Sequence, residues 1–168
     1  AHMDEVGLQV TYVEENGLLR CAKIGTIDDR VIPGRPVVVH TARGPIHGVT
    51  TVPPAAALPE ARSWQVLAID IGVRNRGAAE ELGVAPGLPV TFRRRPFLVN
   101  RRYLSGWALD DRWGCFALIK LLQHAARRMP RGRLTFAWTV QEEVGLRGAQ
   151  ALAARDCYEV VFVIDGFA

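Results

Sequence analysis

Residues 134–155 read LTFAWTVQEEVGLRGAQALAAR, and this stretch decides the fold class of the chain. It opens on a fully apolar segment of strand length, LTFAWTV, and closes on GLRGAQALAAR, whose small residues suit a helix. A second apolar run, EVVFVID, follows at residues 159–165. Continuous apolar strands that alternate with helices are typical of a parallel sheet covered on both faces. The stretch therefore predicts an α/β architecture.

A long helix is predicted just before this stretch. Residues 111–129 read DRWGCFALIKLLQHAARRM, with apolar residues at helical spacing. Asp111 is expected to cap the start of the helix, and Pro130 to end it. Its apolar WGCFALIKLL segment is expected to lie in the core. His124 is expected on the helix surface and is given no role.

The first part of the chain has a different pattern. Residues 8–99 predict a small closed β structure of short strands. The Asn16-Gly17 pair is typical of a hairpin turn between LQVTYV and LLRCAKI. Further strands are expected at 31–41, 45–52, 66–72 and 88–99, with a loop at 53–63 and a short helix at 78–84.

Composition narrows the function classes. The 168 residues suit one domain, or one domain with a small insertion, and 49% are hydrophobic, which allows a sizeable core. No apolar run reaches transmembrane length and no signal-peptide pattern is visible, so no membrane partner is expected. Three widely spaced cysteines are typical of reduced thiols in a cytoplasm. They give no indication of a zinc site built from cysteine.

The chain has a net charge of +4, and some of its arginines gather in two groups. One group flanks the apolar PFLVN segment and the other lies near the predicted end of the long helix. The groups are Arg93, Arg94, Arg95, Arg101 and Arg102, then Arg127, Arg128, Arg131 and Arg133. Basic residues at a helix C-terminus complement its dipole. The first group is expected at a strand edge or a subunit interface, and no nucleic-acid partner is expected.

Acidic residues recur where the predicted strands and helix meet. Glu142 and Glu143 follow one apolar strand, Asp165 ends the next, and Asp110 and Asp111 enter the long helix. Ligands of open α/β sheets bind at the carboxyl ends of the strands, so these acids are expected to converge. Converging carboxylates repel one another unless cations neutralise them. Taken singly, each acid could equally be a helix cap or a solvated turn residue.

Four ordered motifs resemble those of the family-42 metallopeptidases. They are HMDEVG (2–7), ALDDRWGC (108–115), TVQEEVGLRGA (139–149) and VIDGFA (163–168). The LAIDIGVRNRGAAEELGVAPGLPVTF segment also resembles the inserted domain of that family. The resemblance implies a parallel-type sheet with helices, a zinc-peptidase-like catalytic domain, interrupted by an inserted small β-barrel domain. On this basis residues 1–7 begin the catalytic domain, 8–99 form the insertion, and 100–168 continue the catalytic domain.

The resemblance implies two divalent metal ions per subunit, which would be zinc, cobalt or manganese. His2 would bind one metal together with Asp165. Asp110 would bridge the two metals, and Glu143 would bind the metal opposite His2. A cis peptide bond is expected between Asp110 and Asp111.

The resemblance also implies the catalytic roles. Glu142 would act as general base for the attacking water, and Asp4 would orient the His2 imidazole. Backbone groups near Gly145 and Leu146 would shape the pocket. The implied activity is that of an aminopeptidase on short peptides, in a homo-oligomer that ranges from dimer to dodecamer.

The sequence departs from the family pattern at one ligand. The family has a further histidine ligand far downstream of the Asp165 position, so the sequence is expected to be an internal piece of a longer enzyme. His2 could be a cloning scar, but Asp4, Glu5 and Gly7 match the family beside it, which favours a native residue. The alternative functions are a related dinuclear metal deacylase or carboxypeptidase, and a truncated non-catalytic relative. Adjacent glutamates cannot flank a sugar bond, which disfavours a glycosidase.

Overall fold

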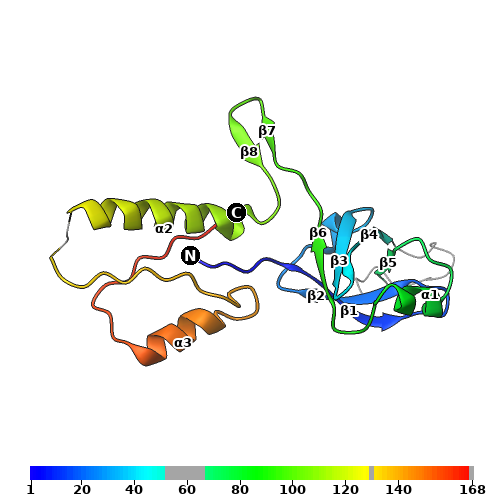
Figure 1. The fold of residues 1–168 in the computed structure, drawn as a ribbon. Coiled ribbons are helices and arrows are strands. Elements are labelled where there is room, and N and C mark those ends of the chain that lie inside the picture. Colours follow the sequence, from blue (N-terminus) through cyan, green and yellow to red (C-terminus); the bar gives the residue numbers. More distant parts are fainter. Residues whose placement is uncertain (52–66, 129–130, 167–168) are drawn as a thin grey trace. The chain divides into compact units, whose positions relative to one another are not determined.

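The computed structural model describes residues 1–51, 67–128 and 131–166 (Figure 1). The chain divides into two compact units. We call Val6–Arg95 the barrel unit, and Ala1–Glu5 together with Pro96–Ala168 the helical unit. The loop predicted at 53–63 lies outside the described residues.

The barrel unit is a closed barrel of six antiparallel strands in the order β1-β2-β5-β4-β3-β6. The strands are β1 (Gly7–Val13), β2 (Leu19–Ile24), β3 (Pro36–Thr41), β4 (Gly44–Thr51), β5 (Ala68–Asp70) and β6 (Pro89–Phe92). The 3-10 turn η1 (Asp29–Val31) and the helix α1 (Arg76–Glu81) lie between strands. Closure pairs both edges of the sheet. The small closed β structure predicted from the sequence is confirmed.

The turn between β1 and β2 follows the chemistry of its residues. Asn16 Oδ1 accepts a hydrogen bond from Leu18 N at 3.0 Å, and Gly17 has a φ of +87°. Asparagine side chains stabilise turns in this way, and glycine adopts a positive φ without a steric penalty. The hairpin predicted from the Asn16-Gly17 pair is therefore confirmed.

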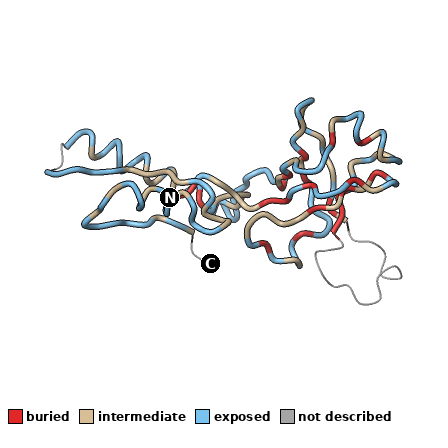
Figure 2. The backbone as a smooth tube through the Cα atoms, turned by 90° about the horizontal axis from the view of Figure 1, so that it is seen from below, coloured by how far each residue is buried: buried red, intermediate tan, exposed pale blue. Residues whose placement is uncertain are grey.

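The hydrophobic core lies in the barrel unit. Alternate strand residues point inward, and the side chains of Leu8, Val10, Leu19, Val37, Val39 and Ile69 are at most 1% exposed. Among the described residues, every buried hydrophobic side chain belongs to this unit. Figure 2 shows the buried residues in red along the strands of the barrel. The barrel unit thus carries a core of its own.

The helical unit consists of a hairpin and two helices. The hairpin pairs β7 (Phe97–Val99) with β8 (Tyr103–Ser105), and Arg101 and Arg102 lie in its turn. The helices are α2 (Leu109–Arg128) and α3 (Arg147–Arg155). Both helices predicted for this part of the chain are thereby confirmed, although α3 begins two residues later than predicted. Arg127 and Arg128 lie in the last turn of α2, as expected.

The strands predicted at 134–140 and 159–165 are absent from the described residues. The only parallel pairing in that part of the chain is an isolated bridge between His2 and Thr139. Residues 160–163 are 67–87% exposed, although they read Val-Val-Phe-Val. A strand needs a neighbouring strand to satisfy its N–H and C=O groups, and the described residues supply one only at residues 1–3. The described chain therefore does not form a parallel sheet.

The α2 helix is exposed rather than buried. Only Asp111 and Gly114 are buried on it, whereas Phe116 is 60% and Leu121 50% exposed. The prediction that its apolar segment lies in the core is therefore wrong for the described chain, because no hydrophobic side chain is buried in the helical unit's described residues. No helix in the described ranges is long and apolar enough to cross a membrane.

Candidate metal centre

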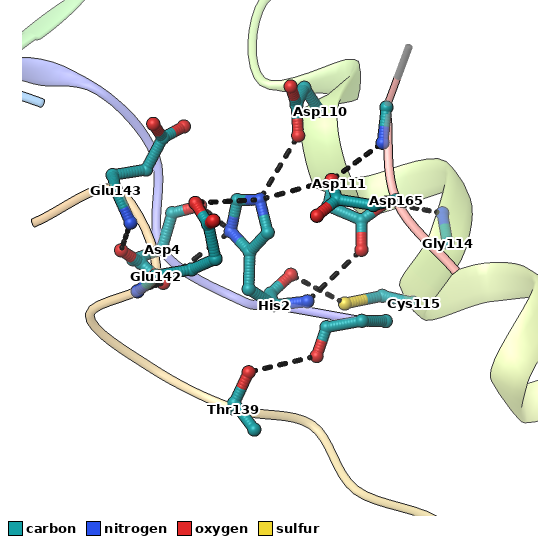
Figure 3. Close-up of polar contacts among 12 residues, drawn as sticks. His2, Asp4, Asp110, Asp111, Gly114, Cys115, Thr139, Glu142, Glu143 and Asp165 are labelled. Atoms are coloured by element: carbon teal, nitrogen blue, oxygen red, sulfur yellow. Dashed lines mark hydrogen bonds and ion pairs between the residues drawn. The ribbon is translucent and has the colours of Figure 1, made fainter. Parts of the chain in front are cut away.

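His2 lies at the centre of a cluster of acidic side chains (Figure 3). Its side chain is 2% exposed. The imidazole Nε2 lies 3.0 Å from Asp110 Oδ1, 3.7 Å from Asp165 Oδ1 and 3.8 Å from Glu142 Oε2. The structure thus brings together acids that are spread over residues 110–165 of the sequence. All of these residues belong to the helical unit.

The potential ligand atoms form two groups that share His2. One group contains His2, Asp110 and Asp165, and the other contains His2, Glu142 and Glu143. Within each group the ligand atoms lie within 4.8 Å of one another. Asp110 comes from the start of α2, the two glutamates from the turn before α3, and Asp165 from the extended segment near the end of the chain. Three separate segments therefore close around one imidazole.

Asp4 contacts both the imidazole and the glutamate turn. The His2 Nδ1 atom lies 3.1 Å from the Asp4 carbonyl oxygen and 3.5 Å from Oδ1 of the same residue. When Nδ1 carries the proton it donates to Asp4, and the Nε2 lone pair is free for a metal. The Asp4 carboxylate accepts hydrogen bonds from the backbone N–H groups of Glu142 and Glu143, each at 3.2 Å. Asp4 therefore links the orientation of His2 to the position of both glutamates.

The two aspartates at the start of α2 contact different groups of His2. Their peptide bond is cis, as expected from the sequence. The Asp110 side chain is 60% exposed and faces the imidazole, whereas Asp111 is buried and accepts a hydrogen bond from the backbone N–H of His2 at 3.0 Å. Asp111 Oδ1 also accepts from Gly114 N at 3.1 Å, so it caps the helix as predicted.

Cys115 is a site residue that the sequence reasoning missed. Its Sγ atom lies 3.0 Å from the carbonyl oxygen of His2. Burial and the neighbouring Asp111 charge raise the pKa of the Cys115 thiol, so the thiol is protonated at neutral pH and can donate. The spacing of Asp111 and Cys115 places both on one face of the helix, which was the available signal. That spacing does not reveal the partner, because the partner is a backbone group.

Burial and the neighbouring carboxylates raise the pKa of Glu143. Burial raises the pKa of Glu143, and the charges of Asp110 and Glu142 raise it further, against a smaller opposing effect of His2. Like charges in a partly buried site disfavour ionisation unless a cation neutralises them. A cation bound among these carboxylates would therefore stabilise their charged forms.

The pKa of His2 is also shifted, by burial and by the neighbouring carboxylates. Burial lowers the pKa of its imidazole, but the hydrogen bond to Asp110 and the charges of Glu142, Asp4 and Asp165 outweigh burial, so the pKa is raised. One imidazole among several carboxylates is a donor set that suits zinc, cobalt or manganese. The residues present therefore fit divalent metal ions. The other three histidines, His40, His47 and His124, are exposed.

The whole chain, residues 1–168, matches the family model described as M42 glutamyl aminopeptidase. The chain belongs to this family. The resemblance drawn from the four motifs is thus confirmed. Among curated M42 relatives, FrvX of Escherichia coli strain K12 is 36% identical over 98% of this chain and 47% of its own length. Lysyl aminopeptidase of Pyrococcus furiosus is 30% identical over 98% of this chain and 49% of its own length.

Solved M42 structures share the fold. A TET aminopeptidase from a marine sediment Thaumarchaeota archaeon has a TM-score of 0.84 at 34% identity, covering 92% of this chain and 46% of that chain. The Pyrococcus horikoshii TET1 peptidase, which can assemble into a tetrahedron or a large octahedral shell, has a TM-score of 0.80 at 43% identity. That match covers 91% of this chain and 47% of TET1. The chain spans about half the length of the relatives it matches.

Proposed function

We propose that the protein is a metal-dependent aminopeptidase that removes N-terminal residues from short peptides. The observation that carries the proposal is the pair of ligand groups sharing His2, in a chain of the M42 family. The aminopeptidases among its relatives support the reaction class. The same ligand chemistry would serve a related deacylase or carboxypeptidase, and the substrate decides between them.

The proposed metal ligands are drawn from the two groups, with Glu142 kept for a different role. His2 and Asp165 would hold one divalent ion, Glu143 would hold a second, and Asp110 would be a ligand of both. The ions would be zinc, cobalt or manganese, because imidazole and carboxylate ligands suit all three. When bound, two such ions polarise the scissile carbonyl and lower the pKa of the attacking water. The closeness of His2, Asp110 and Asp165 supports this assignment.

Glu142 is the proposed general base. Its Oε2 atom lies 3.8 Å from His2 Nε2, so its carboxylate stands beside the proposed metal ligands, and its side chain is 27% exposed and open to water. It takes the proton of the attacking water and passes it to the leaving amine. Asp4 holds the backbone of both glutamates, so that one side chain serves as a ligand and the other moves the proton.

The architecture of the whole protein is part of the proposal. The barrel unit corresponds to an inserted domain, predicted at 8–99, and the helical unit to the catalytic domain, predicted at 1–7 and 100–168. A parallel sheet forms in the catalytic domain when the apolar segments at 134–140 and 159–165 have strand partners. The TET relatives that assemble into shells support a homo-oligomer. The reduced cysteines support a cytoplasmic location.

The test compares a free peptide with its N-acetylated form after loading the protein with zinc or cobalt. We expect hydrolysis of the free peptide alone. Glu142→Ala should lower the rate by roughly 10²- to 10⁴-fold, as general bases contribute that much, while the metal content stays unchanged. Glu80→Ala, an exposed glutamate of α1, is the matched control. Hydrolysis of the blocked peptide, or full activity in Glu142→Ala, would overturn the proposal.

A further inference from the structure

We propose that Asp111 and Cys115 are positioning residues that fix the backbone of His2 from the first turns of α2. The inference rests on the proposed function, in which His2 is a metal ligand. The His2 N–H donates to Asp111 Oδ2 at 3.0 Å, and the Cys115 thiol donates to the His2 carbonyl oxygen at 3.0 Å (Figure 3). One helix therefore holds both polar backbone groups of His2.

Asp111 uses both of its carboxylate oxygens. Oδ2 accepts from His2 N, and Oδ1 accepts from Gly114 N at 3.1 Å. The residue is 1% exposed, so water cannot replace either bond without a rearrangement. The carboxylate that caps α2 is thus also the group that anchors His2. Shortening it would release the helix start and the ligand together.

Gly114 makes the close approach of Asp111 possible. A Cβ atom at Gly114 would lie 2.6 Å from Asp111 Oδ2 and 2.7 Å from its Cγ, and closer still to Oδ1. The carboxylate has no flexible stem that could yield, because Asp111 is buried and bonded at both oxygens. Gly114→Ala should therefore displace the Asp111 carboxylate, although it replaces none of the residues that are proposed to bind metal.

Cys115 anchors the other side of the same residue. Its own carbonyl oxygen accepts from Trp138 Nε1 at 3.3 Å, which joins the helix to the segment that pairs with residues 1–3. The Cys115 thiol donates the hydrogen bond to the His2 carbonyl oxygen. Cys115→Ser would retain a hydrogen-bond donor at this position, whereas Cys115→Ala would remove it.

These contacts fix the backbone from which the imidazole extends. Asp110 faces His2 Nε2 from the same helix start that carries the two anchors. Asp110 and both anchors therefore lie within the first residues of α2, so one short stretch of chain contacts the imidazole and the backbone of His2. Metal sites need such supporting contacts, since a loosely held ligand weakens binding.

The experiment measures His2 itself, with and without metal. In metal-free protein, diethylpyrocarbonate modification of each histidine is followed by peptide mass spectrometry, with exposed His40, His47 and His124 as internal references. In parallel, cobalt titration gives the affinity and the visible spectrum of the bound ion. The variants are Asp111→Ala, Gly114→Ala, Cys115→Ala and Cys115→Ser. The controls are Gly77→Ala, where a Cβ meets only Asn75 Oδ1 at 3.5 Å, and Cys157→Ala at an exposed thiol.

We expect His2 to react at least tenfold faster in Asp111→Ala and Gly114→Ala, with cobalt affinity at least tenfold weaker and an altered spectrum. Cys115→Ala should shift both readouts in the same direction, and Cys115→Ser should restore them. The inference would be overturned if these variants had the same His2 labelling rate and the same cobalt affinity as the wild-type protein. If Asp111→Ala does not fold, as judged by circular dichroism, the two Cys115 variants decide. Wild-type protein that binds no cobalt, while the variants unmask His2, would refute the metal function and leave the positioning role standing.

Discussion

Leu19→Ala should destabilise the barrel unit strongly, whereas Leu121→Ala should hardly affect the chain. Leu19 is fully buried in β2, and the substitution removes three carbon atoms. Burial contributes about 0.8 kcal/mol per carbon, hence roughly 2.4 kcal/mol, and the cavity left behind raises the loss to about 3–5 kcal/mol. Leu121 is 50% exposed on α2, so truncating it leaves no closed cavity and should cost below about 1 kcal/mol.

The assay is urea unfolding followed by circular dichroism, applied to the protein and to residues 6–95 expressed alone. Because all buried hydrophobic side chains of the described residues lie in the barrel unit, we expect residues 6–95 to fold by themselves. In them Leu19→Ala should lower the free energy of unfolding by the same amount as in the protein. An unfolded 6–95 fragment, or equal losses for Leu19→Ala and Leu121→Ala, would contradict a core confined to the barrel.

Two further predictions concern protons and a turn. The pKa values of His2 and Glu143 are both raised, so these two groups bind more protons in the folded metal-free chain than in the unfolded chain, and their contribution to stability should fall as pH rises through those pKa values. Metal binding must displace these protons, so cobalt affinity should increase with pH, and calorimetry in two buffers of different ionisation enthalpy should detect proton release. Gly17→Ala should cost more than about 1 kcal/mol, because φ is +87° and the new Cβ would lie 2.8 Å from Val73 Cγ2. Gly87→Ala has a similar φ but open space, so equal thermal midpoints for the two variants would exclude the clash.

The barrel could be predicted from the sequence because its determinants are local. The Asn16-Gly17 turn and the alternation within each strand identify the strands without knowledge of their partners. The apolar runs at 134–140 and 159–165 carry an equally strong strand pattern. Pairing, however, depends on a neighbouring strand, and the described residues provide only the bridge at Thr139.

The site was predictable in part for a related reason. Carboxylates and histidine carry their chemistry in the side chain, so Asp110, Glu142 and Asp165 could be identified before their geometry was known. The anchoring of His2 by Cys115 could not be identified, because the group that accepts the thiol hydrogen bond is a backbone carbonyl that every residue possesses. A side chain that contacts a backbone group does not require any particular residue type at the partner position.

The distribution of buried residues links stability to function in the helical unit. Its buried described residues are His2, Asp111 and Gly114, which are a proposed ligand, its backbone anchor and the glycine that makes room for the anchor. This unit is therefore organised around a polar centre rather than an apolar one. Hydrogen bonds contribute less net free energy to stability than the burial of apolar side chains does. Repulsion between neighbouring carboxylates lowers the stability of the unit further. Divalent ions that neutralise the cluster would stabilise this fold as they prepare the proposed reaction, so the same residues serve both purposes.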